Sequence, residues 1–253
     1  MDQQESIAVP SVQPASPFMT RFMNVFTSPA ELYSEVVASP ARTSSWLVPY
    51  VLSLLMGCIF TYALFSNQSL RQQLIESRLQ GMREQVAAGK MSEEALEKAS
   101  GFMESPVMFL TIGIAGALVS ITLAMFIAPL VLWMISRFIL KGTASYKKFL
   151  EAYGLSSLTG LLGAVVMLLM MHLLDNFYAQ PGGSIFLMNS FNHHSFLHRL
   201  MAAVQIFGLW QTAVVGIALA KISGKPTGTG IGLSFGLWGA YVLVASAAGW
   251  GMG

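Results

Sequence analysis

The sequence predicts an all-α fold, a polytopic bundle of five transmembrane helices, and two features carry this prediction. First, 54% of the 253 residues are apolar and only 10% are charged, whereas a soluble domain carries about 25% charged residues. Second, the charges are clustered, and most of the uncharged stretches between them have the apolar length of about 20 residues that a bilayer requires. The stretches without Asp, Glu, Lys or Arg are 43–70, 105–136, 152–174, 176–198, 200–220 and 226–253.

The region before the first span is predicted to be a polar tail followed by two short helices. Residues 1–17 are rich in Pro, Ser and Gln, which is typical of a disordered segment. From Phe18 onward, aromatic residues recur at every fourth position, so their rings share one helical face. A second helix has Ser28 as its N-cap and Pro29 at its first position. We therefore predict amphipathic helices in the membrane interface over 18–40.

The predicted spans belong to one membrane domain over 46–250. The second span is longer than a hydrocarbon core of about 30 Å requires, so it must tilt or bend, and Pro129 marks the expected kink. Between the first two spans, residues 67–104 carry 11 of the 26 charges and are predicted to form an extramembrane helical hairpin. The polar window 176–198 is predicted to be a loop. The five spans are predicted at about 46–65, 107–138, 153–174, 200–220 and 230–248.

The distribution of Lys and Arg predicts which side of the membrane each end occupies. Cytoplasmic segments are enriched in these residues, and the rule is strongest for short loops. With the N-terminus inside, the inside segments hold eight of them and the outside segments six, five of which lie in the long 67–104 segment. We expect a cytoplasmic N-terminus and an external C-terminus, in a bacterial inner membrane. The eight inside residues are Arg21, Arg42, Arg137, Lys141, Lys147, Lys148, Lys221 and Lys225.

The fifth predicted span contains small residues at intervals of four, which place them on one face of the helix. They are Gly228, Gly232, Gly236 and Ala240. Small residues allow helix backbones to approach closely in lipid, where no hydrophobic effect drives the pairing of helices. This pattern predicts a packing seam, either within the bundle or between protomers.

His194 and His198 are weak candidates for metal ligands. Their spacing of four would place both imidazoles on one helical face, but a metal site needs one or two further ligands. We favour the alternative, in which they are interfacial histidines bonded to water or carbonyl groups. No cofactor is predicted.

Several classes of function are disfavoured by what the sequence lacks. The net charge of +2 is too small and dispersed for a nucleic-acid binder, and the single Cys58 excludes an internal disulfide. Ion-coupled transporters place charged groups within the membrane, whereas His172 is the only ionisable side chain well inside a predicted span. No catalytic motif has supporting context, so we predict that the chain is not an enzyme.

Three stretches together resemble the YIP1-domain family in its bacterial form. The first runs from Phe26 to Val36 (FTSPAELYSEV), ahead of the first predicted span. The second is the charged stretch from Gly89 to Lys98 (GKMSEEALEK), and the third runs from Lys141 to Ser156 (KGTASYKKFLEAYGLS). The resemblance covers roughly residues 20–250.

The resemblance implies a domain of five spans with a cytoplasmic N-terminus and brings no catalytic residues with it. Eukaryotic relatives are implicated in vesicle traffic and in binding small GTPases, and bacterial relatives have no settled activity. Our leading hypothesis is therefore a non-catalytic membrane scaffold or accessory protein that acts through helix packing. Its expected partners are the lipid bilayer, other membrane proteins or further copies of itself. The alternative is a permease, or a subunit of a multi-component transporter, for an apolar or lipid-like substrate.

Overall fold

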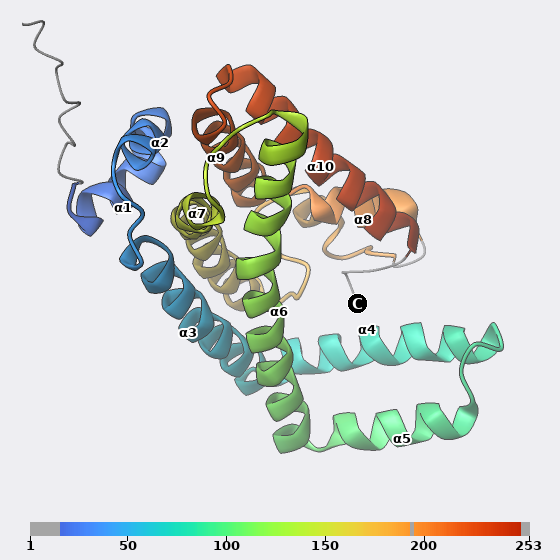
Figure 1. Cartoon of the computed structure of the whole chain (residues 1–253). Coiled ribbons are helices and arrows are strands. Elements are labelled where there is room, and N and C mark those ends of the chain that lie inside the picture. The colour runs from blue at the N-terminus through green and yellow to red at the C-terminus, as the bar shows by residue number, and fades with distance from the viewer. Residues whose placement is uncertain (1–15, 193–194, 249–253) are drawn as a thin grey trace, which may run out of the picture.

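The protein is all-helical over the residues that the computed structural model describes, which are 16–192 and 195–248 (Figure 1). The only strand-like pairing there is an isolated antiparallel bridge between Gly182 and Gln205. The α-helices are α1 (Phe18–Thr27), α2 (Pro29–Ala38), α3 (Ser44–Ser66), α4 (Gln68–Ala87), α5 (Glu93–Glu104), α6 (Pro106–Met134), α7 (Tyr146–Leu173), α8 (Phe196–Ala203), α9 (Ile206–Ile222) and α10 (Thr227–Ala248). A π-helical turn η1 (Ile135–Ile139) extends α6, and a 3-10 turn η2 (Gly183–Leu187) precedes α8.

Four helices in the described residues are long and apolar enough to cross a membrane: α3, α6 with its η1 extension, α7 and α10. The predicted fourth span is divided into α8 and α9, and α9 is an apolar helix of only 17 residues. The interruption has a clear cause. The Gly183 N–H donates to the Val204 carbonyl and the Ile206 N–H donates to the Pro181 carbonyl, so this backbone pairs with the preceding loop. A crossing by α9 therefore stays a prediction.

The long helices are arranged around α7, which packs against α3, α6 and α9, while α10 packs against α9. Figure 1 shows that α3, α7 and α10 begin, and α6 and α9 end, at the end of the bundle that carries α1 and α2. Helices α4 and α5 run antiparallel to each other and project sideways at the opposite end. They occupy the charged stretch 67–104, and its extramembrane position remains a prediction.

Glycines bring the crossing helices together at two points. A Cβ at Gly154 of α7 would lie 2.5 Å from the Cα of Trp46, so this glycine allows α3 to begin against α7. A Cβ at Gly230 of α10 would collide with the carbonyl oxygen of Gly216 in α9. Such close backbone approaches are the usual way in which helices associate in lipid.

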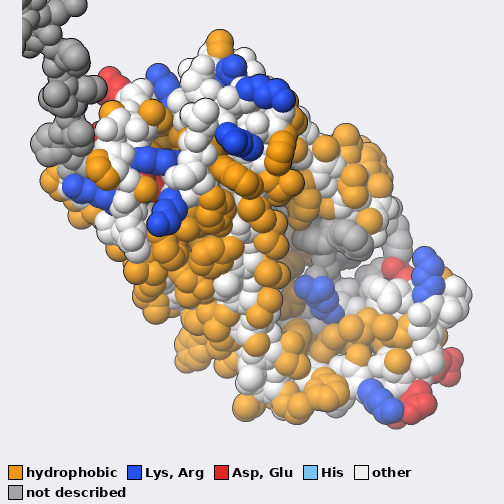
Figure 2. All heavy atoms as spheres, in the orientation of Figure 1, with side chains coloured by type: hydrophobic (Ala, Val, Ile, Leu, Met, Phe, Trp, Pro, Cys, Tyr) orange, Lys and Arg blue, Asp and Glu red, His pale blue; other side chains and the backbone are white. Residues whose placement is uncertain are grey.

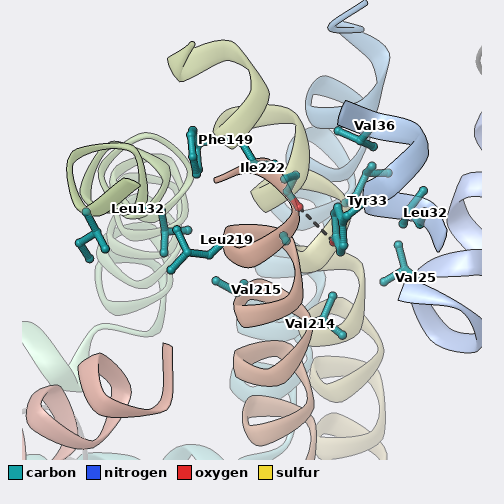
Figure 3. Close-up of a cluster of buried hydrophobic side chains, with 14 of the residues drawn as sticks. Val25, Leu32, Tyr33, Val36, Leu132, Phe149, Val214, Val215, Leu219 and Ile222 are labelled. Carbon is teal, nitrogen blue, oxygen red and sulfur yellow. Dashed lines mark hydrogen bonds between the residues drawn. The ribbon is translucent and has the colours of Figure 1, made fainter. Parts of the chain in front are cut away.

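The largest buried cluster joins the N-terminal helices to the bundle (Figure 3). Its members include Val25 of α1, Leu32, Tyr33 and Val36 of α2, Leu132 of α6, Phe149 of α7, and Val214, Val215, Leu219 and Ile222 of α9. The aromatic residues that the sequence places on a lipid-facing stripe pack against this cluster instead. Helices α1 and α2 are therefore docked on protein, while the side chains of Met19 and Met23 remain exposed.

One boundary differs from the predicted one in a way that matters for the site. Helix α7 begins at Tyr146, before the predicted start of the third span, so Lys148 and Glu151 belong to the helix. Helix α6 continues past Pro129, which is buried within it, and ends in the π-turn.

Candidate functional site

Arg21 of α1 is the centre of a buried polar network. Its side chain is only 1% exposed, and each of the five N–H groups of a guanidinium needs an acceptor when buried. Arg21 supplies five such bonds to four side chains. The acceptors are Glu35 (3.0 and 3.1 Å), Ser39 (3.1 Å), Ser45 (2.9 Å) and Glu151 (2.7 Å). One side chain thus ties α1 to α2, α3 and α7.

Glu35 holds the outer side of this network. Its Oε1 accepts two bonds from Arg21 and one from the Ser16 backbone N–H at 2.8 Å, and its Oε2 accepts from the Ser16 hydroxyl at 2.7 Å. Burial alone would raise the pKa of Glu35, but the hydrogen bonds from Ser16 and Arg21 outweigh it and hold the pKa below its usual value. The carboxylate therefore remains charged throughout the neutral pH range.

Glu151 and Lys148 form the inner side of the network on α7. Glu151 is fully buried, and its Oε1 receives the shortest Arg21 bond while its Oε2 lies 3.6 Å from Lys148 Nζ. Lys148 Nζ also donates to the carbonyls of Val36 and Ser39 at the end of α2. A cation at this position satisfies carbonyls that the helix itself cannot pair and complements the helix dipole.

The network is electrically balanced, because two cations meet two carboxylates. Burying charges is costly unless each is paired and hydrogen-bonded, and Arg21 meets this condition with all its donors. Tyr33 adds a neutral anchor beside it: its hydroxyl lies 2.7 Å from Ser156 Oγ, and burial raises the pKa of this phenol. We call the four charged residues Arg21, Glu35, Lys148 and Glu151 the ionic clamp. It positions α1 and α2 as a platform on the end of the bundle.

Sequence reasoning missed the ionic clamp. The predicted third span, 153–174, left Glu151 just outside it, whereas α7 begins at Tyr146 and places Glu151 in its second turn, fully buried. The available signals were a single Arg in an otherwise uncharged amphipathic helix and a Lys–Glu pair three residues apart at the start of an apolar segment. His172 lies between α7 and α3. Its Nδ1 is 2.9 Å from the Leu168 carbonyl oxygen and its Nε2 is 3.2 Å from the Ala63 carbonyl oxygen.

The predicted glycine seam is placed on an outer face of α10. Gly228, Gly232, Gly236 and Ala240 are all exposed, and a Cβ at any of the three glycines would meet no atom of another element within 4 Å. The close contact with α9 is made by Gly230, on the opposite side of the helix. The seam therefore does not serve packing within the described chain, and its role between protomers remains open to proposal.

The two histidines are not brought together by the described residues. His194 lies outside the described residues, and the Nδ1 of His198 accepts a hydrogen bond from the Asn192 backbone N–H at 3.0 Å. Within the ranges that the structure covers, no group of three or more His, Cys, Asp or Glu residues is placed to hold a metal ion.

Basic side chains gather around the platform (Figure 2). Exposed members at this end of the bundle are Arg42, Arg137, Lys141, Lys147 and Lys225. Three short connections lie at this end, and each contributes a cation: Arg42 between α2 and α3, Lys141 between η1 and α7, and Lys225 between α9 and α10. Such a surface favours contact with anionic lipid headgroups or acidic protein segments.

Several helices that are long and apolar enough to cross a bilayer define an integral membrane protein. The Yip1 domain matches residues 23–249, so the chain belongs to the Yip1 family. The match confirms the resemblance to the YIP1-domain family, and it extends from within α1 to the end of α10. No curated protein and no solved structure matches the chain significantly. The family consists generally of non-enzymatic membrane proteins.

Removing the centre of the ionic clamp should destabilise the protein. Replacing Arg21 by Met leaves Glu151 buried without its main partner, and breaking a buried pair in this way costs about 3–5 kcal/mol. We expect a lower thermal midpoint in detergent and faster proteolysis within residues 18–40. Arg137→Met is the matched control, because Arg137 is exposed and lies outside the clamp. Equal midpoints for the two variants would show that the clamp contributes little.

Proposed function

We propose that this protein is a non-catalytic membrane scaffold that presents the α1–α2 platform to partners. The observation that carries this proposal is the ionic clamp. It fixes α1 and α2 to the bundle through buried ion pairs, whereas two helices on a flexible linker would have none. The outer face of the platform is left for other molecules, since Met19, Met23 and Val37 are exposed. The exposed basic residues around it favour an acidic protein segment or an anionic lipid surface.

The proposal includes a five-span topology in a bacterial inner membrane with a cytoplasmic platform. Support comes from the concentration of Lys and Arg at that end, which is typical of cytoplasmic loops. Helix α9 would be the fifth span. Its length of about 26 Å, at 1.5 Å per residue, approaches the thickness of the hydrocarbon core, and α8 would lie outside that core, before α9 begins.

Reporter fusions test this topology directly. A phosphatase active only outside the cytoplasm should be inactive when fused at residue 1 and active when fused at residue 253, with a fluorescent protein giving the reverse pattern. Reporters that place both ends in one compartment would contradict the five-span arrangement. They would also contradict the proposal that α9 crosses the membrane.

The scaffold role predicts that partners are lost when the outer face of the platform is altered. Full-length protein is crosslinked and purified from its native membrane, and co-purified proteins are compared between the parent chain and Val37→Asp. We expect specific partners to fall severalfold, because the substitution places a charge on the apolar docking face. The control is Glu31→Gln, because Glu31 is also exposed on α2. Unchanged partners in Val37→Asp would count against the platform as the docking surface.

The glycine seam is proposed as a contact between copies of the chain. Gly232→Leu should lower the oligomer fraction in detergent and leave the monomer's thermal midpoint unchanged, because the position is open. Gly230→Leu, one half-turn away, should destabilise the fold itself by overpacking against Gly216, by about 1–3 kcal/mol. An oligomer that survives Gly232→Leu would remove the seam from the proposal.

A second candidate function, a permease for an apolar or lipid-like substrate, is favoured by one observation. Two apolar hollows lie between the long helices, one of about 320 Å³ among α3, α6 and α7 and one of about 730 Å³ among α6, α9 and α10, and Gln211 lines both. Flux of a lipid-like substrate across vesicles would separate a permease from a scaffold.

A further inference from the structure

The larger hollow is a groove whose walls face lipid. Exposed apolar side chains form the two walls, Leu123, Ile127 and Val131 on α6 and Leu237 and Tyr241 on α10. The floor is α9, with Tyr153 of α7 contributing a further lining side chain. Its volume of about 730 Å³ lies in the range of about 300–1,000 Å³ that small-molecule sites occupy.

Four polar side chains that line this groove form no hydrogen bond with the described residues: Gln211, Tyr153, Tyr241 and Trp238. The neighbouring hydroxyls differ: Thr212 donates to the Gly208 carbonyl and Ser234 donates to the Thr212 carbonyl, both at 2.8 Å. Of the four side chains without a hydrogen bond, Tyr241 is 68% exposed on the outer wall and Trp238 offers only a donor. Gln211 on α9 and Tyr153 on α7 are half-buried and are the two that can also accept a hydrogen bond deeper in the groove.

The depth of Gln211 rests on the proposed crossing by α9, which places this residue near the middle of the bilayer. It precedes the end of α9 by eleven residues, which is roughly 17 Å along a helix and about half of a 30 Å hydrocarbon core. A polar group without a partner carries a large free-energy penalty there. The amide lies against α7, because a Cβ at Gly160 would be 2.5 Å from Gln211 Oε1. Gly160 lines the smaller hollow and Gln211 lines both, so the amide is placed where the two hollows meet.

The lining selects the kind of ligand. No Asp, Glu, Lys, Arg or His is among the described residues that line the groove, so a charged headgroup would be buried without a counter-ion. An amide offers both N–H donors and a carbonyl acceptor, and a phenol can do either. A group that combines a hydroxyl with a carbonyl matches both residues, whereas a group with acceptors alone would leave the amide carbonyl unpaired.

The size of the groove argues against a helix from a second copy. A transmembrane helix is a cylinder about 10 Å across and 30 Å long, which is roughly 2,400 Å³, more than three times the groove volume. An extended lipid chain is thinner and can lie between the apolar walls of α6 and α10.

We propose that the groove binds one uncharged glycerolipid. Its free hydroxyl and ester carbonyl hydrogen-bond with the Gln211 amide and the Tyr153 hydroxyl, and its acyl chain lies along α6 and α10. This site goes beyond the scaffold role and does not depend on it, because the groove lies on the flank of the bundle and the platform lies at its end.

The test uses Trp238, which lines the groove. In full-length protein whose other four tryptophans are replaced by Phe, Trp238 fluorescence is titrated in detergent with a monoacylglycerol brominated in mid-chain. We expect saturable quenching with one site per chain. The corresponding brominated fatty acid, ionised at alkaline pH, should bind at least about tenfold more weakly, because its charge would be unpaired.

Three variants assign the binding to the two polar groups. Gln211→Leu should weaken monoacylglycerol binding about tenfold, the effect of losing a buried hydrogen bond with its partner left unsatisfied. Tyr153→Phe removes a single oxygen and should weaken binding severalfold, so it carries the test if Gln211→Leu does not fold. Thr212→Val is the matched control and should bind like the parent, because its hydroxyl is already used within α9.

Distinct results would overturn the proposal. Parental affinity in both Gln211→Leu and Tyr153→Phe would show that the lipid partitions without using the polar groups. Tighter binding of a brominated quinone, which has only acceptors, would reject the hydroxyl-ester assignment. A dimer in detergent that shields Trp238 from every probe would make a second copy the occupant. None of these results bears on the platform, whose test is the loss of co-purified partners.

Discussion

The need to satisfy one buried guanidinium organises the cytoplasmic end proposed for this protein. Arg21 has five donors and almost no access to solvent, so every donor must find an acceptor within the fold. The acceptors come from α2, from the first turn of α3 and from α7. Because Glu151 is 130 residues away in sequence, the N-terminal helices, the beginning of α3 and the beginning of α7 must assemble together.

Other features of the same end follow from this arrangement. Docking α2 on α7 brings Lys148 to the carbonyls of Val36 and Ser39, so a second cation is neutralised while it caps a helix. The approach of α3 to α7 is then close enough that Gly154 cannot carry a side chain next to Trp46. The inner apolar residues of α1 and α2 are buried in the cluster, which leaves the outer faces, with Met19, Met23 and Val37 exposed, for lipid or protein.

The sequence predicted those features that the bilayer or local chemistry imposes. The long apolar helices and the helical character of the chain follow from length and charge, and the start of α2 follows from Ser28 and Pro29. Features that depend on distant contacts were not predictable in this way. The break between α8 and α9 depends on backbone pairing with residues 181–183, and the clamp depends on partners far apart in the chain. The spacing of four places Gly228, Gly232 and Gly236 on one face, but periodicity alone cannot say what that face touches. Within the described chain the contact with α9 is made by Gly230, on the other side of the helix.

The ionic clamp and the groove differ in how far their polar groups are hydrogen-bonded within the chain. The difference indicates that the clamp serves stability and that the groove serves ligand binding. At the end of the bundle, four charges and several hydroxyls are matched almost completely inside the chain, which is what stability requires where water is excluded. On the proposed crossing by α9, Gln211 lies near mid-depth, where an unmatched group is most costly. Its amide forms no hydrogen bond with the described residues, and it lies where a Cβ at Gly160 would be 2.5 Å from Oε1. An apolar residue of similar volume at position 211 would avoid that penalty. An amide at this position is better explained by a ligand that completes its hydrogen bonds than by packing, because an apolar side chain would pack there without an unpaired polar group.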